Sequence, residues 1–165
     1  MKAIAAMSEN RAIGKNGGLP WAPIKADFAW FKEFTTGKIL VMGWNTANTL
    51  PPLKNRNKIV VSTKTSKDNW DIYAYEDYYD PITNSAQTYM LSSCVIELDT
   101  LQPDLVCIGG AKTYELFLPY ITEFYVTHVK GVYDCDVFMP PFEHLFSKQE
   151  LIKEFDGHRV VKYSK

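Results

Sequence analysis

The stretch that decides the fold is Leu105-Val106-Cys107-Ile108-Gly109-Gly110-Ala111-Lys112-Thr113-Tyr114. A short apolar run, typical of a buried strand, leads into a glycine pair, and a helical pattern over residues 112–118 follows. The glycine pair leaves no side chain to block a close backbone approach, and the free amides at a helix start suit a phosphate group. The stretch lacks GxGxxG spacing, so by itself it also fits an ordinary tight turn.

Two further places in the chain have the same order of strand and polar turn. In Val41-Met42-Gly43-Trp44-Asn45-Thr46 a strand ends at glycine before a short helix, and in Val61-Ser62-Thr63-Lys64 two hydroxyls and an ammonium follow a strand. Open α/β sheets bind ligands at the carboxyl ends of their strands, and all three turns lie at such ends. Two of these turns are suited to the two phosphates of a dinucleotide, and their convergence is more informative than any one turn.

Outward from these turns, apolar runs alternate with helical patterns along the chain. This alternation predicts right-handed crossovers and a largely parallel sheet covered on both faces, in one α/β domain over residues 1–165. Asp156-Gly157 between two alternating runs predicts a hairpin, so we expect an antiparallel pair at the sheet edge. The predicted buried strands are residues 3–7, 38–42, 58–61, 105–108 and 124–129, the hairpin strands are 150–155 and 158–163, and the helical patterns cover 25–34, 46–50, 94–101 and 112–118.

The composition excludes several classes of function. A chain of 165 residues is one ordinary domain, and a formal charge of −1 gives no general positive field for nucleic acid or an anionic membrane. The three cysteines include no CxxC pair, which argues against a disulfide framework or a zinc site and favours a reducing, cytoplasmic compartment. The first seven residues are too few for a signal-peptide core, and no apolar stretch approaches the roughly 20 residues that span a bilayer.

Two segments lack a clear periodicity and are expected on the surface. Residues 8–23 contain three glycines and two prolines, and a loop of this length in a compact domain is commonly a lid or a binding loop. Residues 64–88 are rich in Asp, Tyr and Asn, and they fit either a solvated surface excursion or a site for a partner. We expect the first segment to close over a site, and the role of the second stays open.

The first helical pattern carries one acid, Asp27, on an otherwise aromatic face. Trp30, Phe31 and Phe34 follow it at i+3, i+4 and i+7, which puts all four on one side of the helix. A buried carboxylate must be paired, hydrogen-bonded or neutral, and desolvation raises its pKa while the nearby helix N-terminus opposes that. The acid also fits a solvent-facing cap of the helix start. The preceding lid, which ends Gly18-Leu19-Pro20-Trp21, favours a site that closes over the acid and excludes water.

Arg56 and His128 are the other charged groups that the sequence singles out. Arg56 precedes a predicted strand, and it fits either a solvated loop charge or a bidentate clamp on a carboxylate. His128 lies within an apolar strand and is interpreted as a hydrogen-bonded core histidine, while Cys107 is interpreted as a core thiol. The chain has no metal-ligand spacing and no Ser/His/Asp or Cys/His arrangement above background, so hydrolase and metalloenzyme functions are disfavoured.

Taken in order, these motifs resemble the dihydrofolate reductase family over nearly the whole chain. Any one motif is weak, but the ordered set is highly specific. The set consists of Ile4-Ala5-Ala6, residues 11–14, Leu19-Pro20-Trp21, Asp27 with Trp30-Phe31-Lys32, Met42-Gly43 with Thr46, Pro52-Leu53 with Arg56, residues 108–114, residues 125–128, and Asp136 with Pro140.

The resemblance implies a twisted, mostly parallel eight-stranded sheet with an antiparallel C-terminal hairpin edge and about four helices. It implies an oxidoreductase that reduces 7,8-dihydrofolate to 5,6,7,8-tetrahydrofolate with NADPH, serves one-carbon metabolism and thymidylate synthesis, and binds antifolate inhibitors. Asp27 would bond the pterin ring and promote protonation of its N5, with Leu19 and Trp21 delivered by the lid. Arg56 would clamp the α-carboxylate of the glutamate tail. The other expected substrate contacts are Ile4, Ala5, Phe31, Lys32, Leu53, Ile108, Tyr114 and Thr127, the last as a support for Asp27.

The resemblance also implies a cofactor site at the strand-end turns. Gly109 and Gly110 would form a cis-peptide turn beside the phosphates, and Ser62, Thr63 and Lys64 would meet the adenosine 2′-phosphate. The other expected cofactor contacts are Ala6, Ile13, Gly14, Gly17, Gly18, Gly43, Trp44, Asn45, Thr46, Ala111, Lys112, Thr113 and Tyr114. No metal is expected, and we expect a monomer.

Two departures from the family stand out. The family commonly has a basic residue after the strand glycine, where this chain has Trp44-Asn45. Lys112 and Lys64 are the candidates to replace that cation, and Trp44 is a candidate to stack on adenine. Residues 68–88 form an extended region where compact members have a shorter link, and catalysis does not explain its acidic, tyrosine-rich character.

Two other interpretations stay open at the level of sequence. A related reductase of the same fold would act on a pyrimidine of the flavin pathway, although the lid motif, Asp27 and Arg56 together speak against it. A non-catalytic relative would keep the fold as a structural or binding component. The intact Asp27 disfavours that interpretation, while the extended region 68–88 leaves it open.

Overall fold

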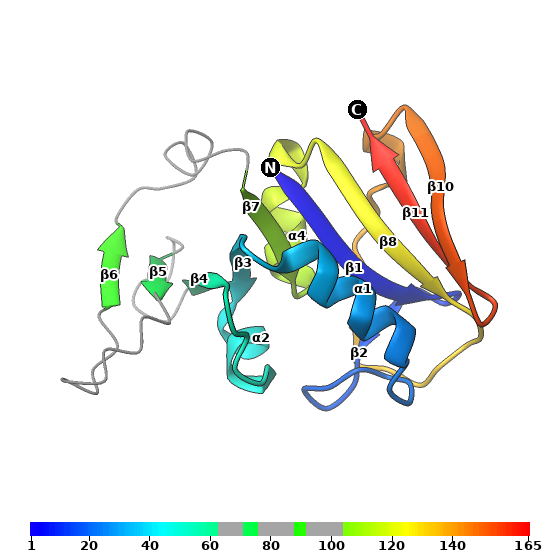
Figure 1. Cartoon of the computed structure of the whole chain (residues 1–165), viewed down its shortest axis with the longest axis horizontal. Helices are drawn as coiled ribbons and strands as arrows, with labels where there is room; N and C mark the ends of the chain where they lie inside the picture. Colours follow the sequence, from blue (N-terminus) through cyan, green and yellow to red (C-terminus); the bar gives the residue numbers. More distant parts are fainter. Residues whose placement is uncertain (63–70, 76–87, 92–103) are drawn as a thin grey trace.

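The computed structural model describes residues 1–62, 71–75, 88–91 and 104–165, and its main feature is one large sheet (Figure 1). Nine strands form this sheet in the order β10-β11-β8-β1-β7-β3-β4-β5-β6, and β2 pairs with β9 in a separate two-stranded sheet. The strands of the large sheet are β1 (Lys2–Ser8), β3 (Ile39–Gly43), β4 (Asn57–Ser62), β5 (Asp71–Tyr75), β6 (Thr88–Leu91), β7 (Leu105–Gly109), β8 (Glu123–Val129), β10 (Lys148–Phe155) and β11 (His158–Ser164).

The centre of the sheet is parallel, as the alternation of strands and helices predicts. β1 pairs with β8 on one side and with β7 on the other, so that Ala3 lies opposite both Phe124 and Cys107. β3 pairs in the same sense with β7 and with β4. All five predicted buried strands are present, each within one residue of its predicted ends. Every residue of β7 is buried, as the continuous apolar run in its sequence indicates.

The chain ends in the predicted antiparallel hairpin. β10 pairs with β11, and β11 adds antiparallel to β8, so β10 is the outermost strand on this side. Asp156 and Gly157 connect the two strands with φ values of 49° and 76°. Positive φ at both central residues is the requirement of a type I′ turn, and Asp-Gly meets it with little strain.

The opposite side of the sheet departs from the prediction. β5 pairs antiparallel with β4, and β6 pairs antiparallel with β5, so the sheet has nine strands rather than eight and both of its edges are antiparallel. β5 lies within residues 64–88, where the sequence indicates only an irregular excursion. Backbone pairing with the open edge of β4, rather than a side-chain pattern, places this strand, so periodicity could not reveal it. The rest of that segment and the predicted helix 94–101 lie outside the described residues.

Helices cover both faces of the sheet. α1 (Lys25–Thr35) and α2 (Trp44–Thr49) lie on one face, and α4 (Ala111–Phe117) lies on the other (Figure 1). Two short 3-10 turns, Leu118–Tyr120 and Glu143–Leu145, complete the helical part of the described chain. The described residues contain three α-helices against the four implied, and α2 begins two residues before its predicted start.

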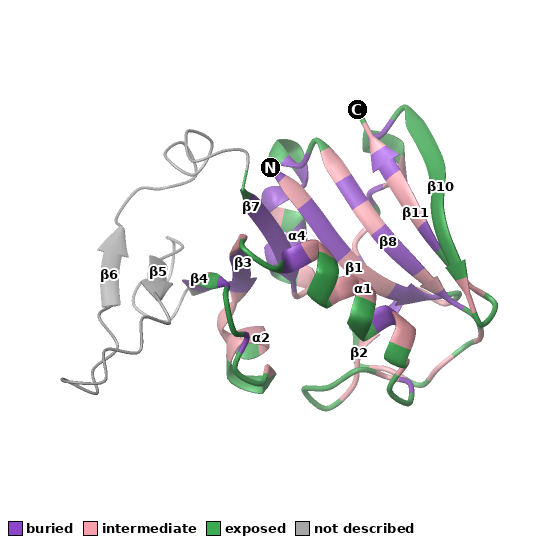
Figure 2. Cartoon of the chain, viewed as in Figure 1, coloured by how far each residue is buried: buried purple, intermediate pink, exposed green. Residues whose placement is uncertain are grey.

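The sheet separates two apolar cores. On the side of α4, a cluster forms around Phe117, Phe124 and Phe142. On the side of α1 and α2, Leu40, Met42 and other strand residues pack against the aromatic rings of α1. Figure 2 shows buried central strands beneath an outer surface of α1 that is exposed. The core on the α1 side matters most for function, because the predicted acid belongs to that helix.

The predicted lid, residues 8–23, is tied to a segment near the other end of the chain. β2 (Ala12–Gly14) pairs with β9 (Val137–Phe138). Lys15 Nζ lies 2.7 Å from Asp134 Oδ2, and the Asn16 amide donates to Asp136 Oδ2 at 2.8 Å. These partners are 119 and 120 residues apart along the chain, so tertiary contacts, rather than local sequence, set the position of the loop.

Candidate active site

Asp27 lies in the first turn of α1, but it does not cap the helix. Ile24 is the N-cap, and no side chain bonds the amides at that end. Asp27 is only 8% exposed, and its carboxylate accepts a hydrogen bond from the hydroxyl of Thr127. Burial raises the pKa of Asp27 above its usual value, while the Thr127 hydrogen bond and the charge on His158 oppose the rise. The solvent-facing cap is therefore the wrong interpretation, and the buried acid is the right one.

The aromatic face of α1 holds Asp27 against the sheet. The rings of Trp30 and Phe34 lie 6.3 and 4.6 Å from the ring of Tyr125 on β8, measured between centroids. Tyr125 and Thr127 are two residues apart and so project from the same face of that strand. Packing of the aromatic rings on Tyr125 therefore brings Asp27 to Thr127, and the predicted spacing along the helix is what makes both contacts possible.

Several predicted substrate residues meet beside this acid. Ile4, Leu53 and Ile108 belong to one apolar cluster, and Phe31 packs against it from α1. The Tyr114 hydroxyl donates to the Ile4 carbonyl at 2.7 Å. Burial raises the pKa of Tyr114 well above its usual value, so this hydroxyl keeps its proton and stays a donor. Two other predicted substrate contacts are less enclosed, because Ala5 is half-buried and Lys32 is exposed.

Arg56 is a buried cation rather than a solvated loop charge, with only 9% of its surface exposed. Its Nε donates to the Lys54 carbonyl at 3.1 Å, and its Nη1 donates to Thr35 Oγ1 at 3.1 Å. Thr35 in turn donates to the Phe31 carbonyl at 2.7 Å. Among the described residues no carboxylate forms an ion pair with Arg56. A buried guanidinium with spare donors and no acidic partner suits an anionic ligand.

The three predicted strand-end turns belong to neighbouring strands, because β7, β3 and β4 are adjacent in the sheet. The Gly109–Gly110 peptide bond is cis, which confirms the expected turn. A Cβ on Gly109, where φ is +92°, would lie 2.5 Å from the Tyr114 ring, and a Cβ on Gly43 would lie 2.7 Å from Thr113 Oγ1. A side chain is therefore excluded at Gly109 and at Gly43, and the bare backbone at these two positions allows a phosphate-containing group to approach closely.

The lid approaches these turns from the other side. A Cβ on Gly17, where φ is +80°, would lie 3.4 Å from Thr49 Cγ2 of α2, and Gly18 exchanges two backbone hydrogen bonds of 2.9 Å with Lys15. Trp21 is buried with its ring 5.6 Å from that of Tyr133, and its Nε1 has no hydrogen-bond partner among the described residues. Leu19 is exposed. The side chain of Trp21 is thus buried in the protein and that of Leu19 is exposed to solvent, although the lid motif predicts a common role for the two residues.

The other predicted cofactor residues fall into three groups. Ala6 on β1 is half-buried, and so are Ile13 and Gly14 on β2, which belongs to the lid. Around the two helix starts, Trp44, Thr46 and Ala111 are half-buried, Asn45 and Lys112 are exposed, and Thr113 is buried. Gly110 approaches α2, since a Cβ there would lie 3.5 Å from Thr46 Oγ1. Ser62 ends β4, whereas Thr63 and Lys64 lie outside the described residues.

Sequence reasoning missed two features of this region. Phe28 follows Asp27 on α1 and is a large apolar ring that is 46% exposed; its position off the buried aromatic face was the available signal of that exposure. Asp134, which pairs with Lys15, carried no signal at all, because an aspartate in a loop is ordinary. His128, by contrast, is half-buried with Nε2 2.9 Å from the Tyr163 hydroxyl, which confirms a hydrogen-bonded histidine, and Cys107 is fully enclosed in the core.

The described part of the chain contains neither a metal-binding cluster nor a membrane-spanning helix. No group of three or more His, Cys, Asp or Glu residues there is arranged to hold a metal ion. No helix in residues 1–62 or 104–165 is long and apolar enough to cross a membrane.

Together, the parallel core of the sheet, the glycine turns at adjoining strand ends and the buried acid define a class, the α/β enzymes that act with a bound nucleotide. The family follows from comparison with known proteins. The family model described as dihydrofolate reductase matches residues 1–161, and the chain belongs to the dihydrofolate reductase family.

Relatives and solved structures agree with this assignment. The chain is 29% identical to the dihydrofolate reductase of Haemophilus influenzae over 157 residues, which cover 94% of this chain and 86% of that protein. It is 32% identical to the dihydrofolate reductase of Neisseria gonorrhoeae, with 85% and 78% covered. A structure of dihydrofolate reductase from Enterococcus faecalis, complexed with NADP(H) and RAB-propyl, superposes with a TM-score of 0.71 at 23% identity, covering 99% of this chain and 94% of that one. At that identity the superposition speaks for the fold.

Proposed function

We propose that this chain catalyses the NADPH-dependent reduction of 7,8-dihydrofolate to 5,6,7,8-tetrahydrofolate, with Asp27 promoting protonation of N5 of the pterin. The observation that carries the proposal is a buried carboxylate on α1, held by Thr127 and flanked by an apolar cluster of strand and helix residues that reaches the strand-end turns. An acid kept in a dry site favours a protonated pterin nitrogen, and the resulting cation accepts hydride more readily.

The substrate has a flat polar ring at one end and carboxylates at the other, and the site offers a partner for each. Asp27 meets the ring, with Phe31 and Leu53 as apolar walls and the carbonyls of Ile4 and Ile108 as acceptors. Arg56 is the partner of the α-carboxylate of the glutamate tail, because it is a buried cation without an acidic neighbour among the described residues. Lys32, Ala5 and Tyr114 complete the proposed contacts.

NADPH fits the strand-end turns, where glycines keep side chains away from the backbone. When bound, it supplies the hydride ion to the pterin carbon beside N5. Gly43, Gly109 and Gly110 allow the close approach of its phosphates, and Thr46 and Thr113 offer hydroxyls from the two helix starts. The chain's own task at the reacting atoms is to orient the ring and to hold a proton near N5.

The lid contributes by excluding water. Trp21, which belongs to the lid, is buried, and the glycines of that loop permit it to rearrange when ligands enter or leave. A dry site strengthens the interaction between Asp27 and the protonated ring, because the effective dielectric falls. Leu19, which is exposed in the present position of the loop, is the proposed contact that closure brings to the ring.

We also propose a single-domain, monomeric enzyme of the cytoplasm that binds antifolate inhibitors. The absence of CxxC pairs in the sequence and the nearly neutral net charge support a reducing compartment and argue against nucleic acid as a partner. Gel filtration against the monomer mass of 18.9 kDa tests the oligomeric state.

Turnover with dihydrofolate tests the proposed function. Purified chain, mixed with NADPH and dihydrofolate, should remove the absorbance of the reduced cofactor, and Asp27→Asn should do so far more slowly at neutral pH. A reductase of flavin-pathway pyrimidines would turn over its pyrimidine substrate instead, and a non-catalytic relative would bind NADPH without turnover. No turnover of dihydrofolate at micromolar enzyme would refute the proposal.

A further inference from the structure

A small hollow lies at the opposite end of the parallel strands from the proposed active site. Its volume is about 180 Å³, and its lining is Lys2, Phe34, Lys38, Asp104 and Val106. Lys2 opens β1, Lys38 and Asp104 immediately precede β3 and β7, and Phe34 belongs to the last turn of α1. The hollow is therefore formed by the amino ends of the strands and the end of the helix, whereas the cofactor turns lie at the carboxyl ends.

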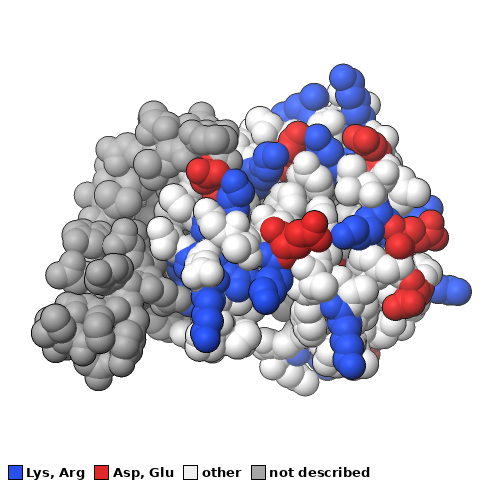
Figure 3. Space-filling model, viewed as in Figure 1, with Lys and Arg blue, Asp and Glu red and all other residues white. Residues whose placement is uncertain are grey.

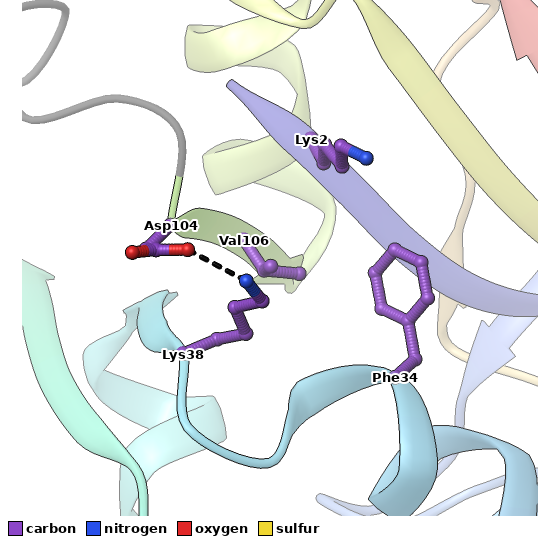
Figure 4. A pocket seen from close by; sticks show the side chains of 5 residues that line it. All are labelled: Lys2, Phe34, Lys38, Asp104 and Val106. Atoms are coloured by element: carbon purple, nitrogen blue, oxygen red, sulfur yellow. Dashed lines mark hydrogen bonds and ion pairs between the residues drawn. The ribbon is translucent and has the colours of Figure 1, made fainter.

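The hollow has two apolar lining residues, Phe34 and Val106, and three charged ones, and it is of a size for one ring. The side chains of Phe34 and Val106 face the same space, with Lys38 and Asp104 on one side and Lys2 on the other, above Phe34 (Figure 4). A cavity of roughly 150 Å³ takes a benzene molecule, so about 180 Å³ admits a single ring with a small substituent. A fused pterin with its tail needs the roughly 300–1,000 Å³ of an ordinary ligand site, which excludes the proposed substrate.

The charges at the rim do not balance. Lys38 Nζ lies 2.6 Å from Asp104 Oδ1, with 38% and 52% of the two side chains exposed, so this is a weak surface pair. Lys2 and Lys162 both pair with Glu123, at 2.9 and 2.5 Å. Among the described residues, the two lining lysines and Lys162 thus share two carboxylates. Figure 3 shows basic side chains next to acidic ones over much of this face, and basic groups without an acidic neighbour toward its lower left.

We propose that the hollow binds a small organic monoanion with one aromatic or branched apolar body, of the size of benzoate. Its ring lies between Phe34 and Val106, and its carboxylate takes the place of Asp104 on Lys38, with the surplus charge from Lys2 adding attraction. The occupant rests on the last turn of α1, whose next residue, Thr35, holds Arg56. The hollow is thus a side site next to the helix that carries Asp27.

Titration of the isotopically labelled chain with benzoate, followed by amide NMR shifts, tests this inference. We expect saturable shifts at the amides of residues 34–38 and 104–106, and none with benzamide, which has the same shape without the charge. Equal responses to benzamide, or no saturation at tens of millimolar, would overturn it. Shifts centred on residues 54–56 alone would place the anion on Arg56 and would also overturn it.

Three variants separate binding from folding. Lys38→Met should weaken benzoate binding about fivefold or more, because the anchoring cation is lost, whereas Lys148→Met, which removes the same charge from the outer strand β10, should leave it unchanged. Asp104→Asn should tighten binding by up to about fivefold, since it removes the internal competitor of an exposed pair. The gain of affinity in Asp104→Asn cannot arise from unfolding. Unchanged or weakened binding in that variant would contradict the proposed position of the carboxylate.

Discussion

Replacement of Asp27 by asparagine isolates its charge from its shape. The amide keeps the size of the side chain and still accepts the Thr127 hydrogen bond, but it cannot carry a negative charge. A pair of charges about 4 Å apart is worth roughly 4 kcal/mol at an effective dielectric of about 20, and Asp27, 8% exposed, is little screened by solvent. Because about 1.4 kcal/mol is a factor of ten in rate, we expect kcat at neutral pH to fall about 10³-fold.

The pH dependence of this variant distinguishes the proposed role from a structural one. Without the carboxylate, solvent must protonate the pterin directly, so the rate should rise about tenfold for each unit by which the pH falls. The assay is loss of NADPH absorbance from mildly alkaline to acid pH, with the affinity for NADPH measured by calorimetry as a control of folding. A variant within tenfold of the parent at neutral pH, or a deficit of constant size at all pH values, would refute the assignment.

The same variant should be more stable than the parent at neutral pH. The pKa of Asp27 is raised in the folded state, so the favourable contribution of its protonated form is fully present below the unfolded pKa and is lost as pH rises through the folded pKa. Asparagine does not ionise and avoids that loss. We expect a gain of about 1 kcal/mol, which is a rise of about 2–4 °C in Tm for a chain of this size, and the gain should vanish in acid. A gain that persists below the unfolded pKa would contradict burial of the charge as its cause.

Three further predictions follow from the site. Arg56→Met should raise the KM for dihydrofolate about 10- to 100-fold with little change in kcat, because hydrogen bonds to charged groups are worth roughly 1.5–3 kcal/mol; a fall in kcat at unchanged KM would contradict the tail-clamp role. Gly109→Ala should lower the free energy of unfolding, measured by urea denaturation, by about 2–4 kcal/mol, since its Cβ would lie 2.5 Å from the Tyr114 ring at φ +92°. The control Gly37→Ala, at φ +75° with nothing within 4 Å, should lower it by only about 1 kcal/mol. Equal losses in the two variants would show that the close contact is not the cause. The ratio of kcat/KM for NADPH over NADH should be well above one and should fall about tenfold in Lys64→Met; a parental ratio near one would mean that 2′-phosphate recognition was lost with the basic residue after Gly43.

The sequence predicts those parts of the protein whose residue pattern is local, extending over only a few neighbouring residues. The five parallel strands are continuous apolar runs, and each was predicted within one residue of its ends. The aromatic face of α1 repeats every three to four residues, and Asp27 stood out because it interrupts that repeat. The Asp156–Gly157 turn is equally local, since two adjacent residues carry the requirement for positive φ.

The features that the sequence does not reveal depend on contacts between distant segments. In the sequence, Arg56 looks like an ordinary loop arginine. Only the folded structure shows that it is buried and that it donates a hydrogen bond to Thr35 on α1. The lid loop is positioned by Asp134 and Asp136, more than a hundred residues away. β5 exists because β4 offers an open edge, and no alternation in its own sequence announces it. Tertiary context overrides local pattern in all three places.

Helix α1 links the two ends of the proposed substrate site. Its two buried residues, Asp27 and Thr35, are both polar, which is unusual for a helix that packs on a sheet through aromatic rings. They are eight residues apart, or about 12 Å at 1.5 Å per residue. Asp27 serves the pterin ring, and Thr35 holds Arg56 for the glutamate tail. One rigid element therefore sets the distance between the two recognition points, so a kink or a glycine between them should impair ring protonation and tail binding together, whereas a change at either end alone should impair only one.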